Sequence, residues 1–217
     1  MSSSILLIFH CRVSRFSIIP MKHAIRAGLA AAALGLALGA IPRLAAADGD
    51  DTAFTNLVAL ASQRLALAEP VARWKWANGK PIEDRPREAE LLAAVEKRAT
   101  QAGIDPAFAR AFFEDQIEAS KDMQNALFAA WRASHPPEGA PPDLAAVTRP
   151  KLDRLTQAML AGLAQVEPLR RAPDCQARLA RSIANWKALT RYDASQAQAL
   201  NTSLAHVCAG GGASAIG

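Results

Sequence analysis

The chain has 217 residues, of which 25 are Lys or Arg and 20 are Asp or Glu, and these totals suggest a basic protein. Five of the basic residues lie among the first 47, which contain no acid, so residues 48–217 hold 20 bases and 20 acids. A neutral remainder lacks the bulk positive field on which non-specific nucleic-acid binding depends, and we therefore exclude nucleic acid as a partner.

The front of the chain has the order of features that is typical of a secretory signal peptide. From Met21 a short basic region precedes an apolar stretch over 27–41, and three alanines end at Ala47. We predict cleavage after Ala47, a periplasmic or secreted location, and one mature domain over 48–217. Met21 is an alternative start codon, because the twenty residues before it fit no part of a signal. An uncleaved membrane anchor is the other interpretation, but the apolar run is shorter than the roughly 20 residues that a span needs.

The mature region predicts an all-α fold without a sheet. It is rich in Ala and Leu and shows almost no alternating β-branched runs. The first helix is predicted over 52–78, where apolar residues are spaced to form one stripe. Pro70 lies inside this helix and removes a backbone hydrogen bond, so we expect a kink there rather than a stop, because the apolar pattern continues beyond it.

Five further helices complete a predicted single-domain bundle of about six helices. They are expected over 84–101, 105–134, 150–166, 173–188 and 194–208. Asp84 and Asp105 each precede a proline in the first turn, which is the usual start of a helix. Four prolines and a glycine over 135–142 indicate a loop, and the tail over 210–217 is predicted to be disordered.

The cysteines indicate one disulfide. Cys11 leaves with the signal segment, so Cys175 and Cys208 remain, 33 residues apart. Two cysteines in an exported chain favour a bridge, although two free thiols are the alternative. Neither cysteine has a histidine partner that suggests catalysis, and His135 and His206 alone form no ligand cluster, so we assign no catalytic or metal role to the cysteines.

Two basic residues of the first helix are candidates for an anion site. Arg64 and Lys75 are eleven residues apart, which at 100° per residue places them on nearly the same face, about 16 Å apart along the axis. Apolar residues surround both, and a charge in such surroundings needs a partner, which a bound anion would supply. By spacing alone, the alternative is that Lys75 extends to solvent between Trp74 and Trp76. The third helix adds a line of polar residues, Gln116, Ser120 and Gln124, which alone is a weak signal.

The joint pattern of residues resembles the helical chorismate mutases, specifically their exported gamma subclass, over essentially the whole mature region. The matching residues are Arg64, Leu65, Val71, Ala72, Trp74, Lys75, Trp76, Pro81, Ile82, Glu83, Asp84, Arg87, Glu88, Ile104, Asp105, Pro106, Phe113, Asp115, Gln116, Ile117, Ala119, Gln124 and Trp131. The resemblance implies an isomerase that rearranges chorismate to prephenate without a metal or cofactor. It also implies a homodimer in which each site is complete within one chain, and it supports the disulfide.

The resemblance further implies a role for each site residue. Lys75 and Gln124 correspond to the catalytic pair at the ether oxygen of the breaking bond. The substrate-binding positions correspond to Arg64, Arg87, Asp84, Glu88, Ser120 and Arg149. Among these, Arg64 and Arg149 bind carboxylates, Arg87 is the second-helix arginine of the site, and the two acids surround the substrate hydroxyl. The match at Arg149 crosses the proline-rich loop.

Two other functions fit part of the pattern. An exported helical binding module or chaperone would explain the signal peptide, the disulfide and the amphipathic helices, but not the joint occurrence of Arg64, Lys75, Arg87 and Gln124. A chorismate-utilising lyase on a similar scaffold would release pyruvate instead of prephenate. An assay of chorismate loss and of its products separates these possibilities.

Overall fold

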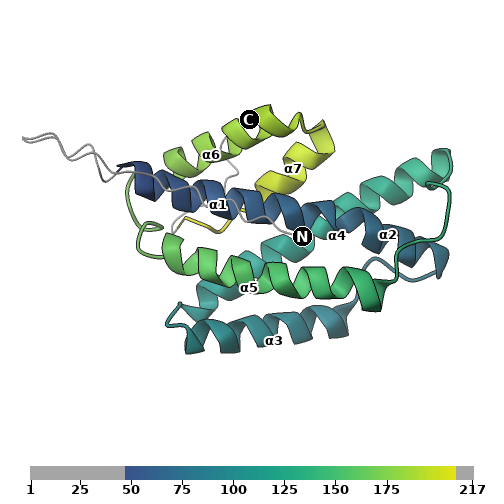
Figure 1. The fold of residues 1–217 in the computed structure, drawn as a ribbon, viewed down its shortest axis with the longest axis horizontal. Coiled ribbons are helices and arrows are strands. Elements are labelled where there is room, and N and C mark those ends of the chain that lie inside the picture. The colour runs from purple at the N-terminus through teal and green to yellow at the C-terminus, as the bar shows by residue number, and fades with distance from the viewer. Residues whose placement is uncertain (1–46, 209–217) are drawn as a thin grey trace, which may run out of the picture. The chain divides into compact units, whose positions relative to one another are not determined.

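A computed structural model describes residues 47–208 of the chain (Figure 1). These residues belong to one compact unit, and they form helices and connecting turns without a strand. The fold is therefore all-α, as predicted. Within this part of the chain, no helix combines the length and the apolar character that a membrane crossing requires. The predicted signal peptide, the alternative start at Met21 and the predicted disordered tail concern residues outside the described part, and these stay predictions.

The predicted first helix is present and is kinked. It consists of α1 (Ala47–Ala66) and α2 (Ala68–Ala77), which are separated only at Leu67. There the Leu67 N–H donates to the Arg64 carbonyl at 3.0 Å, a tighter turn than that of an α-helix. The kink lies about one turn before Pro70, because the proline ring clashes with the carbonyl four residues earlier and offers it no N–H.

The next three predicted helices begin and end close to their expected residues. They are α3 (Arg85–Gln101), α4 (Pro106–Ala133) and α5 (Arg149–Val166). The predicted caps are confirmed: the Asp84 side chain accepts from the Arg87 N–H, and the Asp105 side chain accepts from the Ala107 N–H. Counting α1 and α2 as one kinked helix, these and the two that follow give six α-helices in the described region.

The last two helices are α6 (Cys175–Thr190) and α7 (Ala194–Thr202). The prediction that the final helix reaches Cys208 is wrong, since regular helix ends at Thr202 and single turns follow. The reason lies at Ser203, whose hydroxyl donates to the Leu200 carbonyl at 2.8 Å and whose own carbonyl accepts from the buried Gln116 amide. These side-chain bonds replace the backbone ladder and redirect the chain.

A short π-helical turn that was not predicted, η1 (Leu144–Thr148), lies between the proline-rich loop and α5. Asp143 caps this turn by accepting from the Ala146 N–H at 2.8 Å, and the Thr148 N–H bonds to the Asp143 carbonyl at 3.2 Å. The turn packs against α2 and α5. It therefore fixes the direction in which the chain enters α5 at Arg149.

The core lies where α1 crosses the other long helices. In Figure 1, α1 runs beside α5, and contacts between helices also join α1 to α6, α3 to α4, and α2 to α4. Phe54, Leu57, Phe112, Phe113 and Leu163 are completely buried there. The predicted disulfide is confirmed: Cys175 at the start of α6 is bonded to Cys208, with their Cα atoms 5.9 Å apart.

Candidate active site

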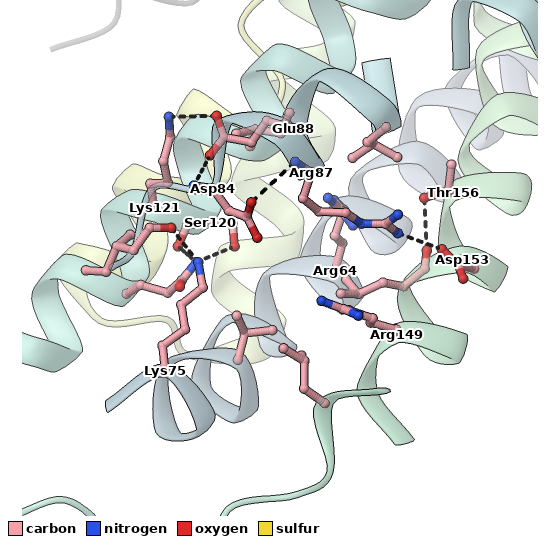
Figure 2. Close-up of a pocket in the computed structure, with 17 residues that line it drawn as sticks. Arg64, Lys75, Asp84, Arg87, Glu88, Ser120, Lys121, Arg149, Asp153 and Thr156 are labelled. Atoms are coloured by element: carbon pink, nitrogen blue, oxygen red, sulfur yellow. Dashed lines mark hydrogen bonds and ion pairs between the residues drawn. The ribbon is translucent and has the colours of Figure 1, made fainter. Parts of the chain in front are cut away.

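One cavity is lined by residues from α1, α2, α3, α4, α5, η1 and the α2–α3 loop. Its volume is about 130 Å³, similar to an engineered cavity of about 150 Å³ that holds a benzene ring. All eight predicted site residues line it: Arg64, Lys75, Asp84, Arg87, Glu88, Ser120, Gln124 and Arg149. Figure 2 shows the side chains of Arg64, Lys75, Glu88 and Arg149 converging from separate helices. The structure thus brings together residues that are up to 85 positions apart in the chain.

Arg64 forms the buried floor of this cavity. It lies in the last turn of α1 and is only 8% exposed, and its Nε has no hydrogen-bond partner in the described protein. Burial lowers the pKa of Arg64 to about 10, with Asp153 opposing that shift and Arg87 adding to it. The guanidinium therefore stays protonated at neutral pH. A buried, charged donor without a partner is costly, so this group is well suited to an anionic ligand.

Lys75 extends from α2 into the same cavity. Its side chain is partly buried, and its ammonium donates a short hydrogen bond to the Ile82 carbonyl in the α2–α3 loop. Burial lowers the pKa of Lys75, while the charges of Asp84 and Glu88 oppose the shift and that of Lys121 adds to it. The neighbouring Trp76 instead makes edge-to-face contacts with Phe128 and Trp131 of α4. The amine is thus directed into the cavity, and the alternative of extension to solvent does not describe this structure.

Gln124 and Ser120 form the wall contributed by α4. Gln124 is 3% exposed, and its amide nitrogen donates to the Ser120 carbonyl at 3.1 Å and to the Ser120 hydroxyl at 3.2 Å. Its amide oxygen is buried without a partner. Gln116, the third residue of the polar line, does not join them, because it is completely buried and donates to the Ser203 carbonyl. The four-residue spacing along α4 therefore placed two of the three residues in the cavity.

Asp84, Arg87 and Glu88 enter the cavity from the first turn of α3. Glu88 accepts from the Asp84 N–H at 3.1 Å, and Asp84 accepts from the Arg87 N–H at 3.3 Å, so the acids also cap the helix. Acidic groups are favoured at a helix N-terminus, where backbone N–H groups are free. The same contacts that begin α3 thus hold these three side chains at the cavity.

Arg149 begins α5 directly after the π-helical turn. It is exposed, and within residues 47–208 it has no hydrogen bond or ion pair to another side chain. One turn later, Asp153 lies 3.6 Å from Arg87, and this pair links α5 to α3. Figure 2 shows Arg64, Arg87 and Arg149 on the side of the cavity next to Asp153, with Lys75 on the other side. Arginine pairs with carboxylates through two parallel hydrogen bonds, so this side suits a carboxylate.

Two charged residues of the cavity, Lys121 and Asp153, were not predicted from the sequence. Asp153 follows Arg149 by four residues, so their shared face of α5 was a signal that could have identified it. Lys121 follows Ser120 directly, where the four-residue spacing along α4 gives no sign of it. With both included, five cations and three acids line the cavity.

A wider hollow of about 570 Å³ shares Lys75, Asp84, Leu144 and Arg149 with this cavity. The shared residues indicate that the hollow forms its mouth. Within the described region no His, Cys or Tyr lines the inner cavity. Its chemistry is therefore that of fixed cationic and amide donors around a small anion, in which developing negative charge can be stabilised.

Comparisons with known proteins agree with this chemistry. The sequence profile of the family described as chorismate mutase type II matches residues 55–125. The "Secreted chorismate mutase" of Mycobacterium tuberculosis (strain ATCC 25618 / H37Rv) is 36% identical over 185 residues, which are 82% of this chain and 91% of that protein. The "Secreted chorismate mutase" of Mycolicibacterium smegmatis is also 36% identical, over 71% of this chain and 85% of its own length.

Solved structures give the same result. A chorismate mutase from Burkholderia thailandensis is 73% identical, with a TM-score of 0.71, and the match covers 72% of this chain and 99% of that one. A chorismate mutase from Burkholderia phymatum is 34% identical with a TM-score of 0.71, over 75% of this chain and 99% of that one.

Proposed function

This chain belongs to the chorismate mutase family, and from that premise we propose that the cavity between α1, α2, α3, α4 and α5 converts chorismate to prephenate with the residues assigned below. One observation carries the assignment: all eight residues matched to the family's site line one cavity, and the most deeply buried cation among them, Arg64, has an unpartnered donor. The enzyme is an isomerase, since substrate and product have the same atoms.

The reaction needs orientation and charge stabilisation rather than a nucleophile. Chorismate carries two carboxylates and rearranges through a chair-like transition state, in which a carbon–oxygen bond breaks, a carbon–carbon bond forms and negative charge gathers on the ether oxygen. An enzyme accelerates this step by holding the reactive conformer and by directing fixed donors at that oxygen. Groups that bind substrate and transition state equally contribute to affinity alone.

Arg64 and Arg149 are the proposed carboxylate ligands, and Arg87 is the third cation on that side. Arg64 has a free Nε at the floor, and Arg149 has no protein partner among the described residues. Both are therefore free to pair with the substrate. Arg87 is less free, because it already contacts Asp153 at 3.6 Å and Glu90 at 3.3 Å.

Lys75 and Gln124 are the proposed donors to the ether oxygen. The ammonium of Lys75 is held over the cavity by its bond to the Ile82 carbonyl. The Gln124 amide nitrogen faces Ser120. The amide nitrogen carries two N–H groups, so one can keep its bond to the Ser120 carbonyl while the other turns from the Ser120 hydroxyl to the substrate. Asp84 and Glu88 then remain as acceptors for the substrate hydroxyl.

The enzyme is exported, as the two secreted relatives are. We propose that export uses a signal peptide ending at Ala47. We also propose that the mature chain is a homodimer of the gamma subclass, with each site built from one chain. The resemblance supports the dimer, and mass measurements of the mature N-terminus and of the assembly in solution test both statements.

Lys75→Ala tests the assignment of the cavity. We expect kcat to fall by about 100-fold to 1,000-fold, which is the effect of removing one donor from a developing oxyanion. Lys97→Ala is the matched control, because Lys97 is exposed on α3 and lies outside the cavity, and it should leave kcat unchanged. Chorismate loss is followed by absorbance, and prephenate and pyruvate are measured as products. Equal effects of the two substitutions would remove Lys75 from the mechanism, and pyruvate as the product would indicate a lyase.

A further inference from the structure

Lys121 is a charged residue of the cavity to which the assignment above gives no role. It lies on α4 beside Ser120, and its side chain is only 18% exposed. Its ammonium lies 2.6 Å from Glu118 and 3.5 Å from Glu88, and Figure 2 shows the contact with Glu88 at the edge of the cavity. Of these two acids, Glu88 lines the cavity and is 22% exposed, whereas Glu118 is outside it and 61% exposed.

The two oxygens of Glu88 serve different helices. Oε1 accepts from the Asp84 N–H at 3.1 Å, which fixes the start of α3, while Oε2 faces Lys121 of α4. Lys121 therefore joins the first turn of α3 to α4 at the point where Asp84, Arg87 and Glu88 enter the cavity. The Glu88 carboxylate is thus held by α3 through one oxygen and by Lys121 of α4 through the other.

The charge of Glu88 also matters for a substrate with two carboxylates. An ionised acid beside a dianion repels it, and this repulsion is strong where water is largely excluded. A cation 3.5 Å from Glu88 offsets the repulsion and leaves the carboxylate able to accept a hydrogen bond. Lys121 also contacts Glu118, but that acid is 61% exposed and lies outside the cavity, so solvent screens most of its charge.

We propose that Lys121 is a positioning residue for substrate binding: it neutralises Glu88 and holds its carboxylate as an acceptor for the substrate hydroxyl. This proposal rests on the function proposed above. It predicts an effect on KM rather than on kcat, because Lys121 acts on bound substrate and transition state alike through Glu88.

The test is a double-mutant cycle of Lys121→Met and Glu88→Gln, with kcat and KM measured on the mature chain. Lys121→Met should raise KM about fivefold, the upper range for a partly exposed ion pair, and should change kcat less than twofold. Lys121→Arg should retain the wild-type KM. In the Glu88→Gln background, Lys121→Met should change KM less than twofold, because no charge is left to neutralise.

Two matched controls sharpen the result. Lys97→Met removes an exposed lysine outside the cavity, and Glu118→Gln removes the other acid that contacts Lys121; both should keep KM within twofold of wild type. Thermal unfolding monitored by circular dichroism checks that each variant folds. If Lys121→Met does not fold, Lys121→Gln replaces it with the same expectations.

Several results would overturn the proposal. Lys121→Met could match Lys97→Met, lower kcat instead of raising KM, or raise KM equally with and without Glu88. An effect of Glu118→Gln as large as that of Lys121→Met would show that Glu88 is not the group through which Lys121 acts. A wild-type chain that does not convert chorismate would instead refute the proposed function, so the two failures are distinguishable.

Discussion

Gln124→Glu should convert an enzyme with a flat pH profile into one that requires acid. An amide donates hydrogen bonds without titrating, whereas a carboxyl group donates only when it is protonated. Gln124 is 3% exposed, and its amide nitrogen faces the Ser120 carbonyl at 3.1 Å, so an ionised carboxylate there would be buried against an acceptor. Burial raises the pKa of a carboxyl group above its usual value of about 4.3.

The size of the effect follows from that pKa. If the nearby Lys75 limits the rise to about two units, the carboxyl titrates near pH 6.3, and its protonated fraction falls from about 86% at pH 5.5 to about 6% at pH 7.5. The variant's kcat/KM should therefore fall about 15-fold across this interval. The wild-type value should stay within about twofold, because the pKa of Arg64, lowered to about 10, lies well above this range.

Stability provides a second measurement on the same variant. Because the carboxyl pKa is raised on folding, the folded state binds the proton more tightly than the unfolded chain. The free energy of unfolding relative to wild type should therefore decrease as pH rises from about 4.3 to about 6.3, by roughly 2.7 kcal/mol in total. Gln157→Glu, at an exposed position of α5 outside the cavity, is the control and should show neither change. A flat profile for Gln124→Glu, or an equally steep one for wild type, would refute the role of Gln124.

Three further substitutions test separate parts of the structure. Arg149→Ala should lower kcat/KM about 10-fold to 100-fold, which is the range for a hydrogen bond to a charged group. The Tm should not change, because this exposed arginine has no side-chain partner among the described residues. A large fall in Tm would show that Arg149 stabilises the fold instead. Replacing Cys175 and Cys208 by Ser should lower the free energy of unfolding by about 3–4 kcal/mol, which is the chain-entropy value for a loop of 33 residues. Urea unfolding measures this change, and unchanged stability would contradict the prediction. Arg64→Met should leave the substrate-free protein equally or more stable while kcat/KM falls at least about 100-fold, and lost stability with retained activity would reverse the assignment.

The helices could be predicted from local chemistry, and their exceptions have a tertiary cause. Asp84 and Asp105 cap α3 and α4 through bonds within three residues of themselves, so the sequence alone contains the signal. The early end of α7 depends instead on Gln116, 87 residues before Ser203, whose amide takes the carbonyl that a longer helix would use. No local pattern around Ser203 carries that information.

The site residues likewise include some that local spacing predicts and others whose position depends on tertiary structure. Spacing along one helix placed Arg64 and Lys75 on a common face, and the structure directs both into one cavity. The prediction that they converge with residues of α3, α4 and α5 came from the family resemblance, because periodicity along one helix does not indicate which helices pack together. Neither helical spacing nor the family resemblance identified Lys121 and Asp153 as cavity residues. Lys121 pairs with Glu88 on another helix, and a salt bridge between helices leaves no trace in the spacing of either one. For Asp153 the only signal was its four-residue spacing from Arg149 on α5.

The cavity is arranged for a ligand rather than for its own stability. A buried polar group without a partner costs about 1–3 kcal/mol, and both the Arg64 Nε, a donor, and the Gln124 amide oxygen, an acceptor, are in that state. Asp153 offsets part of the Arg64 charge, yet this carboxylate also contacts Arg87 and so is shared between two arginines. A dianionic substrate supplies an acceptor for the Arg64 Nε. Its binding then removes the free-energy cost of burying this donor without a partner. Donors that are fixed before the reaction need no reorganisation when charge develops on the ether oxygen, which is the condition under which such groups accelerate the step.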